Sequence, residues 1–539
     1  DFKVSQVRDA EIGILLKPNS NVTSNGNIIT QCAIGIKSDH ANFYSEDNTF
    51  NTSSRLPWLP TFSGQIEVPL QNKMNTGLLT INNNMLIDFN SHYNNIWNGL
   101  VSNASTNIVI ESDFNDIITQ NNDFDNFGNA MLLKDSYGSN LSVIGDNDIN
   151  DCTTGVRILG AKTEISSNSI FDVDYGIIAK NSSAPLTCEG NEIKSRIYGI
   201  QLNSCTGSQK KLEYNEITNV GTQGSIDDGC IYINNPQSIT KANLNTMYIK
   251  GGIFGYRGTP GYPSIIQKNT ALFENSTRSF GFGFHIDGNR SYLSCNTSAA
   301  PASSDKEIYG YHQNMANANF NCNLTTGNLR RGFSILESNP ASYFAGNEVG
   351  GNLGLLVEEG SMLSLSSNLV NNGNCWTGSS VKDALNKNLS APLVSMSRFT
   401  VNQQQSSCYL PDWEANATWF VNLTNQNTTY SCGNLCPNGG AGSGFGPSPC
   451  DYAEELIPLI NNSIEYANFP NERRWTDHFQ VYKLLIESDC NSLSQTMQYF
   501  VDQNSDSEIG NLVQVDLSLK NLALDSDGPL SSALDSLNS

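Results

Sequence analysis

Two adjacent carboxylates near the middle of the chain are the residues best suited to carry out a reaction. Asp227 and Asp228 lie in Ile226-Asp-Asp-Gly-Cys230, and His285 follows in Phe284-His-Ile-Asp287. Paired carboxylates can protonate a leaving group and activate water, and histidine exchanges protons near neutral pH. Aspartates before a glycine also commonly cap a turn. The pattern leaves both interpretations open, a glycosidase-like catalytic group at Asp227, Asp228 and His285 and a structural turn, and we favour the turn.

A second candidate site combines aromatic rings with a guanidinium group. The segment Gly255-Tyr-Arg-Gly-Thr-Pro-Gly-Tyr-Pro263 has the glycine and proline content of a loop. Aromatic rings and a guanidinium suit the binding of sugar rings or of a partner surface. We therefore name Tyr256, Arg257 and Tyr262 as candidate binding residues, with a structural loop inserted at one corner of a repeat as the favoured alternative.

The other polar residues predict no metal site and no cofactor. The basic pairs Lys210-Lys211 and Arg330-Arg331 would be needed beside an acidic calcium cluster in a polysaccharide lyase, but neither pair adjoins one in the sequence. We interpret both as solvated corners. The 5 histidines show none of the spacings typical of a zinc site.

The cysteines indicate an oxidising compartment. Four of them lie close together in the sequence: Cys408, Cys432, Cys436 and Cys450. We expect two disulfides in this segment, with a Cys₄ metal site as the alternative. Cys295 and Cys322 each precede a repeated asparagine, one repeat apart, so their Cα atoms are expected about 5 Å apart, within disulfide range. The alternative for this pair is a column of reduced thiols in the core.

These residues must be positioned by a repeat. Asn-x-Ile triplets begin at Asn147, Asn168, Asn191 and Asn215, with spacings of 21, 23 and 24 residues. A second column begins at Gly155, Gly176 and Gly199, each followed by an apolar run. Further candidate positions of the asparagine column are Asn27, Asn84, Asn107 and Asn122 before the triplets, and Asn245, Asn269, Asn296, Asn323, Asn347 and Asn368 after them.

A period of this length with short alternating apolar runs predicts a parallel β-helix, since helical repeats have periods of about 33–47 residues. Spacings longer than the basic period are interpreted as loops inserted at one corner. We expect the repeated asparagine to adopt the left-handed conformation of a tight bend and to hydrogen-bond to its equivalents on adjacent coils.

The two columns resemble the right-handed parallel β-helix superfamily, which includes pectate lyases, polygalacturonases, phage tailspikes and bacterial surface proteins. The resemblance covers about two thirds of the chain and implies a fold rather than a function. Polygalacturonase-like members carry a Gly-His-Gly and an Arg-x-Lys beside their aspartates, and this chain lacks both companions of Asp227 and Asp228. The chain also resembles large exported surface proteins of Bacteroidota, but the terminal sorting domain of type IX secretion is missing.

Four regions are predicted along the 539 residues. Residues 1–26 form a cap, 27–410 the β-helix with its corner loops, and 411–450 a Cys- and Gly-rich linker. Residues 451–539 form a small α-helical module with an acidic tail, because the apolar spacing becomes helical in 453–460, 475–486 and 493–501.

The composition excludes several partners. A net charge of −22 argues against nucleic acid, and no apolar run is long enough to span a membrane. We expect a non-catalytic extracellular or cell-surface protein, the β-helical stalk or body of a bacterial adhesin or appendage. It would associate with itself, with other subunits of a surface assembly, or with cell-surface glycans. A polysaccharide-binding or polysaccharide-degrading β-helix is the alternative, and carboxylates with aromatic rings on adjacent coils would favour it.

Overall fold

A computed structural model describes most of the first 422 residues and a short part of the C-terminal region. The described ranges are 6–8, 10–52, 74–117, 128–134, 142–206, 210–222, 227–274, 278–301, 306–316, 318–336, 344–359, 373–376, 382–389, 399–401, 411–422 and 495–513, with the single positions 361, 391, 394, 397, 432, 482 and 486. The chain forms two compact units, Asp1–Asn438 and Gly439–Ser539.

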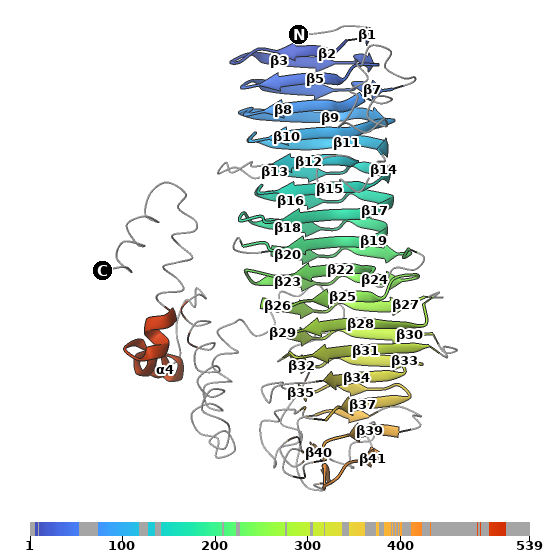
Figure 1. Cartoon of the computed structure of the whole chain (residues 1–539), viewed down its shortest axis with the longest axis vertical. Coiled ribbons are helices and arrows are strands. Elements are labelled where there is room, and N and C mark those ends of the chain that lie inside the picture. Colours follow the sequence, from blue (N-terminus) through green and yellow to red (C-terminus); the bar gives the residue numbers. More distant parts are fainter. Residues whose placement is uncertain are drawn as a thin grey trace, which may run out of the picture. The chain divides into compact units, whose positions relative to one another are not determined.

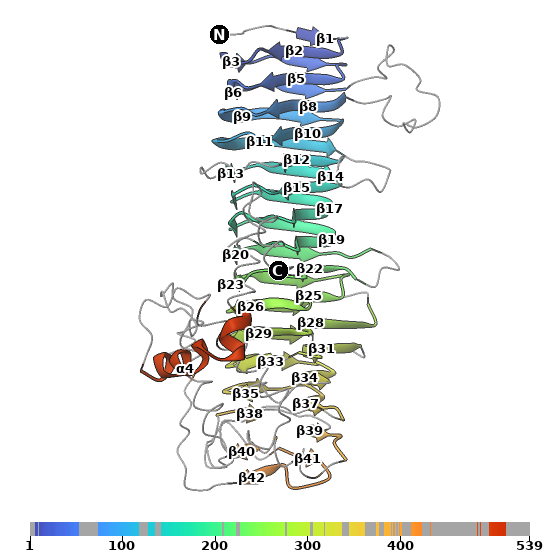
Figure 2. The ribbon, with the colours of Figure 1, turned by 60° about the vertical axis from the view of Figure 1, so that its left-hand side comes forward.

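The first unit is a solenoid of parallel β-strands, which confirms the predicted fold class. Successive coils stack on one another so that each strand pairs with its equivalents in the coils before and after it (Figures 1 and 2). The strands form three parallel ladders. The handedness of the coil stays a prediction.

The first ladder begins at the glycine column and carries the candidate site. In order, its strands are β2 (Ile12–Leu16), β5 (Ile34–Asp39), β8 (Met74–Ile81), β10 (Ile96–Asn103), β12 (Asn129–Lys134), β15 (Thr154–Leu159), the second halves of β17 (Ser169–Lys180) and β19 (Glu192–Asn203), β22 (Gly229–Asn234), β25 (Phe254–Gly258), β28 (Phe280–Asp287), β31 (Glu307–Asn314), β34 (Arg331–Leu336), β37 (Leu353–Val357), β39 (Lys382–Asn386) and β41 (Trp413–Glu414).

The second ladder precedes the asparagine corner. Its strands are β3 (Asn21–Asn25), β6 (Asn42–Glu46), the first halves of β9 (Met85–Asn94) and β11 (Ile108–Ile117), β13 (Ser142–Gly145), β16 (Thr163–Ser166), β18 (Leu186–Glu189), β20 (Lys210–Glu213), β23 (Thr240–Asn243), β26 (Gly261–Gln267), β29 (Asn289–Ser294), β32 (Asn319–Asn321) and β35 (Phe344–Ala345).

The third ladder follows that corner. It contains β1 (Gln6–Arg8), β4 (Ile28–Thr30), β7 (Thr49–Asn51), the remaining halves of β9, β11, β17 and β19, β14 (Asp148–Cys152), β21 (Glu216–Asn219), β24 (Thr246–Ile249), β27 (Thr270–Phe273), β30 (Thr297–Ala300), β33 (Leu324–Gly327), β36 (Glu348–Val349) and β38 (Cys375–Trp376).

The ladders extend past both predicted boundaries of the β-helix. β1, β2 and β3 pair with the next coil inside the segment 1–26 that was predicted to be a cap. At the other end, β41 pairs with β39, and β40 (Phe399–Val401) pairs with β42 (Phe420–Asn422), so strands continue into the predicted linker. Both boundaries were placed where the asparagine spacing became irregular, although strand pairing does not require that residue.

The second unit is described only in part. The helix α4 (Gln495–Ser505) overlaps the predicted helical run 493–501, and residues 508–513 are also helical. Met497, Phe500 and Val513 are buried within it. The predicted helix 453–460, the Gly-rich linker and the acidic tail lie outside the described residues. No helix among the described residues is long and apolar enough to cross a membrane.

The asparagine column forms a hydrogen-bonded ladder, as expected. From Asn147 onwards the Nδ2 atom donates to the Oδ1 atom of the next asparagine, as from Asn168 to Asn191 at 2.8 Å and from Asn191 to Asn215 at 2.9 Å. The same Oδ1 atom also accepts the backbone N–H of the preceding asparagine. For example, Asn191 Oδ1 accepts the backbone N–H of Asn168 at 3.1 Å. These bonds continue to Asn374.

The expected left-handed conformation of these asparagines is wrong, because it belongs to the residue before each of them. Asp146, Ser167 and Tyr214 have φ angles of 53°, 56° and 56°, and each precedes an asparagine of the column. The left-handed residue makes the bend, and the asparagine that follows is buried. This leaves the bend position open to many residue types, while the buried position requires an amide.

The glycine column is required by the close approach of the backbones. A Cβ atom added at Gly155 would lie 2.6 Å from the carbonyl oxygen of Gly176 in the next coil. Inside the coil, aliphatic side chains stack into one core, and aromatic stacks such as Phe50, Tyr93 and Phe114 fill it near the N-terminal end, with ring centroids 4.6 Å apart.

A candidate binding face on the first ladder

A second hydrophobic cluster lies outside the core, on the outer face of the first ladder. Tyr198, Ile253 and Phe254 are its buried members, and four partly buried residues pack against them: Tyr175, Ile197, Tyr232 and Phe282. Several of these rings directly precede the glycine that begins the inner run of their strand, as in Tyr175-Gly176 and Tyr198-Gly199. Since neighbouring residues in a strand point to opposite faces, the glycine faces the core and the ring faces outward.

The rings follow one another along the ladder. The centroids are 6.0 Å apart for Tyr175 and Tyr198, 4.9 Å for Tyr198 and Tyr232, and 5.9 Å for Tyr232 and Phe254. Further along, Phe282 lies 5.4 Å from Tyr309. Six consecutive strands of this ladder, β17 to β31, therefore each present an aromatic ring on this side, which we call the aromatic face.

A charged network crosses the aromatic face. The guanidinium of Arg257 bonds to a carboxylate oxygen of Asp227 and donates from Nη2 to Asp287 Oδ2 at 3.2 Å. It also lies over the ring of Tyr232, 5.6 Å from the centroid. The hydroxyl of Tyr198 donates to Asp227 Oδ2 at 2.9 Å. One guanidinium thus fixes two carboxylates from different coils against the rings.

The network also reaches His285. Its Nε2 atom lies 3.0 Å from Asp287 Oδ1, and its ring lies 5.0 Å from that of His312 on the next strand. Burial by itself raises the pKa of Asp287, but the hydrogen bond from His285 and the charges of His285 and Arg257 outweigh it and lower the pKa to about 2. Burial lowers the pKa of His312 to about 3. Asp287 is therefore a carboxylate and His312 a neutral imidazole at physiological pH.

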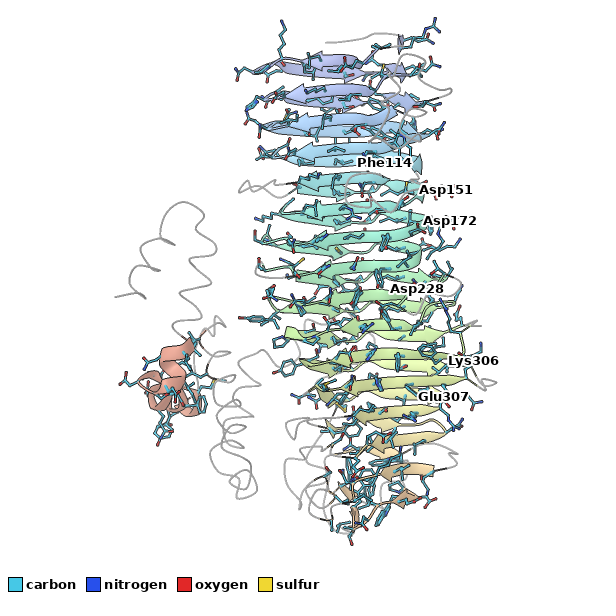
Figure 3. All side chains as sticks on the ribbon, viewed as in Figure 1. Phe114, Asp151, Asp172, Asp228, Lys306 and Glu307 are labelled. Carbon is cyan, nitrogen blue, oxygen red and sulfur yellow. A yellow bond between two sulfur atoms is a disulfide. The ribbon has the colours of Figure 1, made fainter. Side chains whose placement is uncertain are left out.

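Asp228 is separated from this surface. Its side chain is 1% exposed, and it pairs with Arg278 at 3.1 Å. Its Oδ2 atom also accepts the backbone N–H of Thr222 at 2.7 Å and the hydroxyl of the same residue at 2.8 Å. The turn-capping alternative therefore describes Asp228, whose position in the solenoid is labelled in Figure 3.

The candidate catalytic group is accordingly not assembled as a pair of carboxylates. Asp227 lies on the aromatic face, whereas Asp228 is buried in an ion pair. His285 is on the same face as Asp227 but bonds to Asp287, a residue outside the predicted set. Both aspartates precede strand β22, which begins at Gly229, and the two neighbouring side chains have different surroundings.

The three candidate binding residues also differ in their surroundings: one is buried in the core, and two are at the surface. The expectation that Tyr256 is available on a loop is wrong, because it is in strand β25 and completely buried in the core. Arg257, the next residue, is on the aromatic face. Tyr262 is in β26 of the second ladder and is partly exposed. The glycines and prolines suggested a loop, but all of them except Pro260 lie within the two strands β25 and β26.

The basic pairs differ from the solvated corners expected for them. Lys210 is fully buried, and its Nζ atom donates to the carbonyl oxygen of Ala184 at 2.5 Å. Burial lowers the pKa of Lys210 to about 8. Arg330 is exposed and pairs with Glu307 at 3.3 Å, whereas the guanidinium of Arg331 lies 4.7 Å from the ring centroid of Tyr309. Lys211, in β20, is partly exposed, so the expectation is wrong for Lys210 and holds for the exposed Arg330.

A disulfide joins Cys322 to Cys432, with their Cα atoms 5.7 Å apart. The expected bridge between Cys295 and Cys322 is therefore wrong, because a sulfur atom forms only one disulfide. Cys295 and Cys375 each take part in a disulfide as well. Five thiols outside any disulfide are buried in the described part of the coil: Cys32, Cys152, Cys188, Cys205 and Cys230. Cys408, Cys436 and Cys450 lie outside the described residues.

Most residues of the aromatic face were not predicted from the sequence. Tyr175, Tyr198 and Tyr309 were not named as candidates, and neither were Phe282 and Asp287. The available signal was an aromatic residue before a repeated glycine, in Tyr175-Gly176, Tyr198-Gly199, Phe254-Gly255, Phe282-Gly283 and Tyr309-Gly310. The irregular spacing after Asn215 concealed it.

Within the described residues, no group of three or more histidine, cysteine, aspartate or glutamate side chains is arranged to hold a metal ion. No family model, curated protein or solved structure matches the chain.

Proposed function

We propose that this chain is an extracellular β-solenoid that binds polysaccharide on its aromatic face without cleaving it. The observation that carries the proposal is the row of rings on six consecutive strands, crossed by the Asp227–Arg257–Asp287 network. Aromatic rings stack on the apolar faces of sugars, and fixed carboxylates and guanidinium groups hydrogen-bond to hydroxyls. This combination on adjacent coils favours the polysaccharide-binding alternative over a purely structural stalk.

Binding without cleavage is supported by the state of the carboxylates. Hydrolysis of a glycosidic bond needs one carboxylic acid that can donate a proton and one carboxylate. The pKa of Asp287 is lowered to about 2, so it is not a proton donor near neutral pH. Asp228 is buried against Arg278 and cannot reach a ligand on the surface. The proposal therefore assigns these aspartates to positioning and hydrogen bonding.

The extracellular location is supported by the disulfide between Cys322 and Cys432. Disulfides persist in oxidising compartments, whereas thiols stay reduced in the cytosol. A rigid solenoid outside the cell with a sugar-binding face suits an adhesin or a component of a surface appendage, as the sequence led us to expect.

The test combines a glycan array with a reducing-sugar assay on the intact chain. We expect binding to one or more polysaccharides and no release of reducing ends. Tyr232→Ala removes the ring between Tyr198 and Phe254 and is expected to weaken binding about tenfold. Tyr44→Ala is the matched control, because Tyr44 is a partly exposed tyrosine on β6 that packs against Phe89 away from the aromatic face.

Equal affinity of the wild type and Tyr232→Ala would refute the assignment of binding to the aromatic face. Release of reducing ends by the wild type would refute the non-catalytic part of the proposal. Circular dichroism of both variants separates a loss of binding from a loss of fold.

A further inference from the structure

The spacing of the aromatic face points to the shape of its ligand, given that the proposed polysaccharide binding holds. Strands of neighbouring coils lie about 4.8 Å apart. The four ring pairs on neighbouring strands that are described above have centroid distances from 4.9 Å to 6.0 Å. One coil therefore advances the face by about the length that a single pyranose ring adds to an extended glycan chain. A chain that lies along the coil axis meets an equivalent position at each coil.

The exposed rings are distributed along this axis rather than gathered at one point. Tyr198 and Phe254 are 8% and 1% exposed, so they form the base of the face. Tyr175 at the N-terminal end, Tyr232 in the middle and Phe282 towards the C-terminal end are partly exposed and pack against that base. Separate contacts along one direction suit a polymer better than a single sugar.

The charges on the face balance. Three carboxylates contact the rings or the guanidinium groups: Asp227, Asp287 and Glu307. Three guanidinium groups accompany them, from Arg257, Arg330 and Arg331. Their formal charges cancel, apart from any charge on the imidazoles, although the whole chain has a net charge of −22.

This balance leaves the face without a local excess of either charge that would attract a charged polymer. An acidic polysaccharide is repelled by the chain as a whole and finds each of two guanidinium groups, Arg257 and Arg330, already paired with a carboxylate. A basic polysaccharide finds no local excess of carboxylates. Paired side chains still offer lone pairs and N–H groups to hydroxyls, so an uncharged glycan retains its hydrogen bonds.

We infer that the ligand of the aromatic face is an uncharged, extended polysaccharide that lies along the coil axis, with about one sugar ring per coil. The rings of Tyr175, Tyr232 and Phe282 stack on sugar faces at separate positions along it. The Asp227–Arg257–Asp287 network hydrogen-bonds to the hydroxyls of the central sugars. Longer chains gain contacts until they cover the face from Tyr175 to Tyr309.

The experiment measures the affinity of the intact chain for neutral oligosaccharides of increasing length by isothermal titration calorimetry. The probes are disaccharides, tetrasaccharides and hexasaccharides of β-1,4-linked glucose, mannose and xylose, with oligogalacturonate of matched length as the acidic comparison. We expect affinity for one neutral series to rise with each step, by roughly tenfold or more from disaccharide to hexasaccharide. We expect the acidic chain to bind at least tenfold more weakly than the neutral hexasaccharide.

The variants test the direction of the chain. Tyr175→Ala, at one end, is expected to reduce the affinity gained between tetrasaccharide and hexasaccharide and to leave disaccharide binding unchanged. Tyr232→Ala, in the centre, is expected to weaken all lengths. Tyr44→Ala should change none of them.

The outcomes separate the two proposals. Binding that is equal for disaccharide and hexasaccharide, or stronger for oligogalacturonate, would overturn the inference while leaving polysaccharide binding intact. Equal weakening of every length by Tyr175→Ala would overturn the axial orientation. Absence of binding to every glycan on the array would instead overturn the proposed function on which the inference rests.

Discussion

Replacing Asn215 by alanine tests whether the amide ladder holds the coils together. Its Nδ2 atom donates to Asn245 Oδ1 at 2.8 Å and to the carbonyl oxygen of Cys188 at 2.9 Å. Its Oδ1 atom accepts Nδ2 of Asn191 at 2.9 Å and the backbone N–H of the same residue at 3.2 Å. All four bonds are lost in Asn215→Ala, and the side chain is 1% exposed, so water does not replace them freely.

The expected cost follows from these four bonds. A buried hydrogen bond contributes about 0.5–1.5 kcal/mol net, and a group left without a partner costs more. The alanine variant should therefore lower the free energy of unfolding by about 2–4 kcal/mol. Asn150→Ala is the control, because Asn150 makes an exposed bond to Asp148 at 3.0 Å. An exposed substitution of this kind changes stability by less than about 0.5 kcal/mol.

The chain itself suggests a partial rescue. Where the asparagine column is interrupted, Ser91 and Ser112 occupy its place, and Ser112 Oγ accepts the backbone N–H of Ser91 at 3.2 Å. Asn215→Ser should thus keep an acceptor for Asn191 and lose less stability than Asn215→Ala. Urea unfolding followed by circular dichroism, with midpoints and slopes compared, measures all three variants. A midpoint for Asn215→Ala equal to that of Asn150→Ala, or no difference between the serine and alanine variants, would refute the reasoning.

Three further predictions concern other parts of the solenoid. Gly155→Ala should cost about 2 kcal/mol or more in urea unfolding, because its Cβ would lie 2.6 Å from a backbone oxygen, whereas Gly145→Ala, with 3.6 Å of space, should cost much less. Replacing Cys322 and Cys432 together by serine removes a link across 110 residues and should cost about 4–5 kcal/mol; an unchanged thermal midpoint would contradict this. Burial raises the pKa of Asp88 despite its hydrogen bonds, so the folded state binds that proton more tightly, and its contribution to stability falls as pH rises above about 4. Asp88→Asn lacks this titration, so its stability relative to the wild type should increase as the pH is raised above about 4 in the same assay.

The coil was predictable because two of its positions tolerate almost no substitution. Gly155, Gly176 and Gly199 repeat because a side chain there would meet the next backbone, and Asn168 and its equivalents repeat because a buried corner needs both a donor and an acceptor. Both requirements recur in most coils, so they appear in one sequence as a period.

The exceptions in the ladder were not predictable from that period. Asn84 and Asn107 had been expected as members, but the ladder passes through Ser91 and Ser112 in that region. The difference arises because Asp88 is completely buried there and accepts bonds from the hydroxyls of Ser91 and Ser112, each at 2.8 Å. Asn122 and Asn368 lie outside the described residues, and Asn374 follows Asn347 in the ladder.

The aromatic face was harder to predict because its residues share a direction rather than a type. Tyrosine, phenylalanine and arginine occupy the position before the glycine in different coils, and Gly229 occupies it in one of them, paired with Tyr198. Asp287 joins Arg257 only because two coils with different insertions place Arg257 opposite His285, two residues before Asp287, on the neighbouring strand. Such a site depends on pairing across coils, which the spacing after Asn215 did not reveal.

The left-handed residue before each ladder asparagine has a consequence for how the chain can change length. Because the bend is made by Asp146, Ser167 or Tyr214 with nearly the same φ, and the amide bonds repeat from coil to coil, the end of one coil is interchangeable with the end of another. A duplication or deletion that runs from one ladder asparagine to the next keeps every junction intact and shifts the remainder of the solenoid by about 4.8 Å. The solenoid can therefore be lengthened or shortened in whole coils, because the junctions between coils are structurally equivalent.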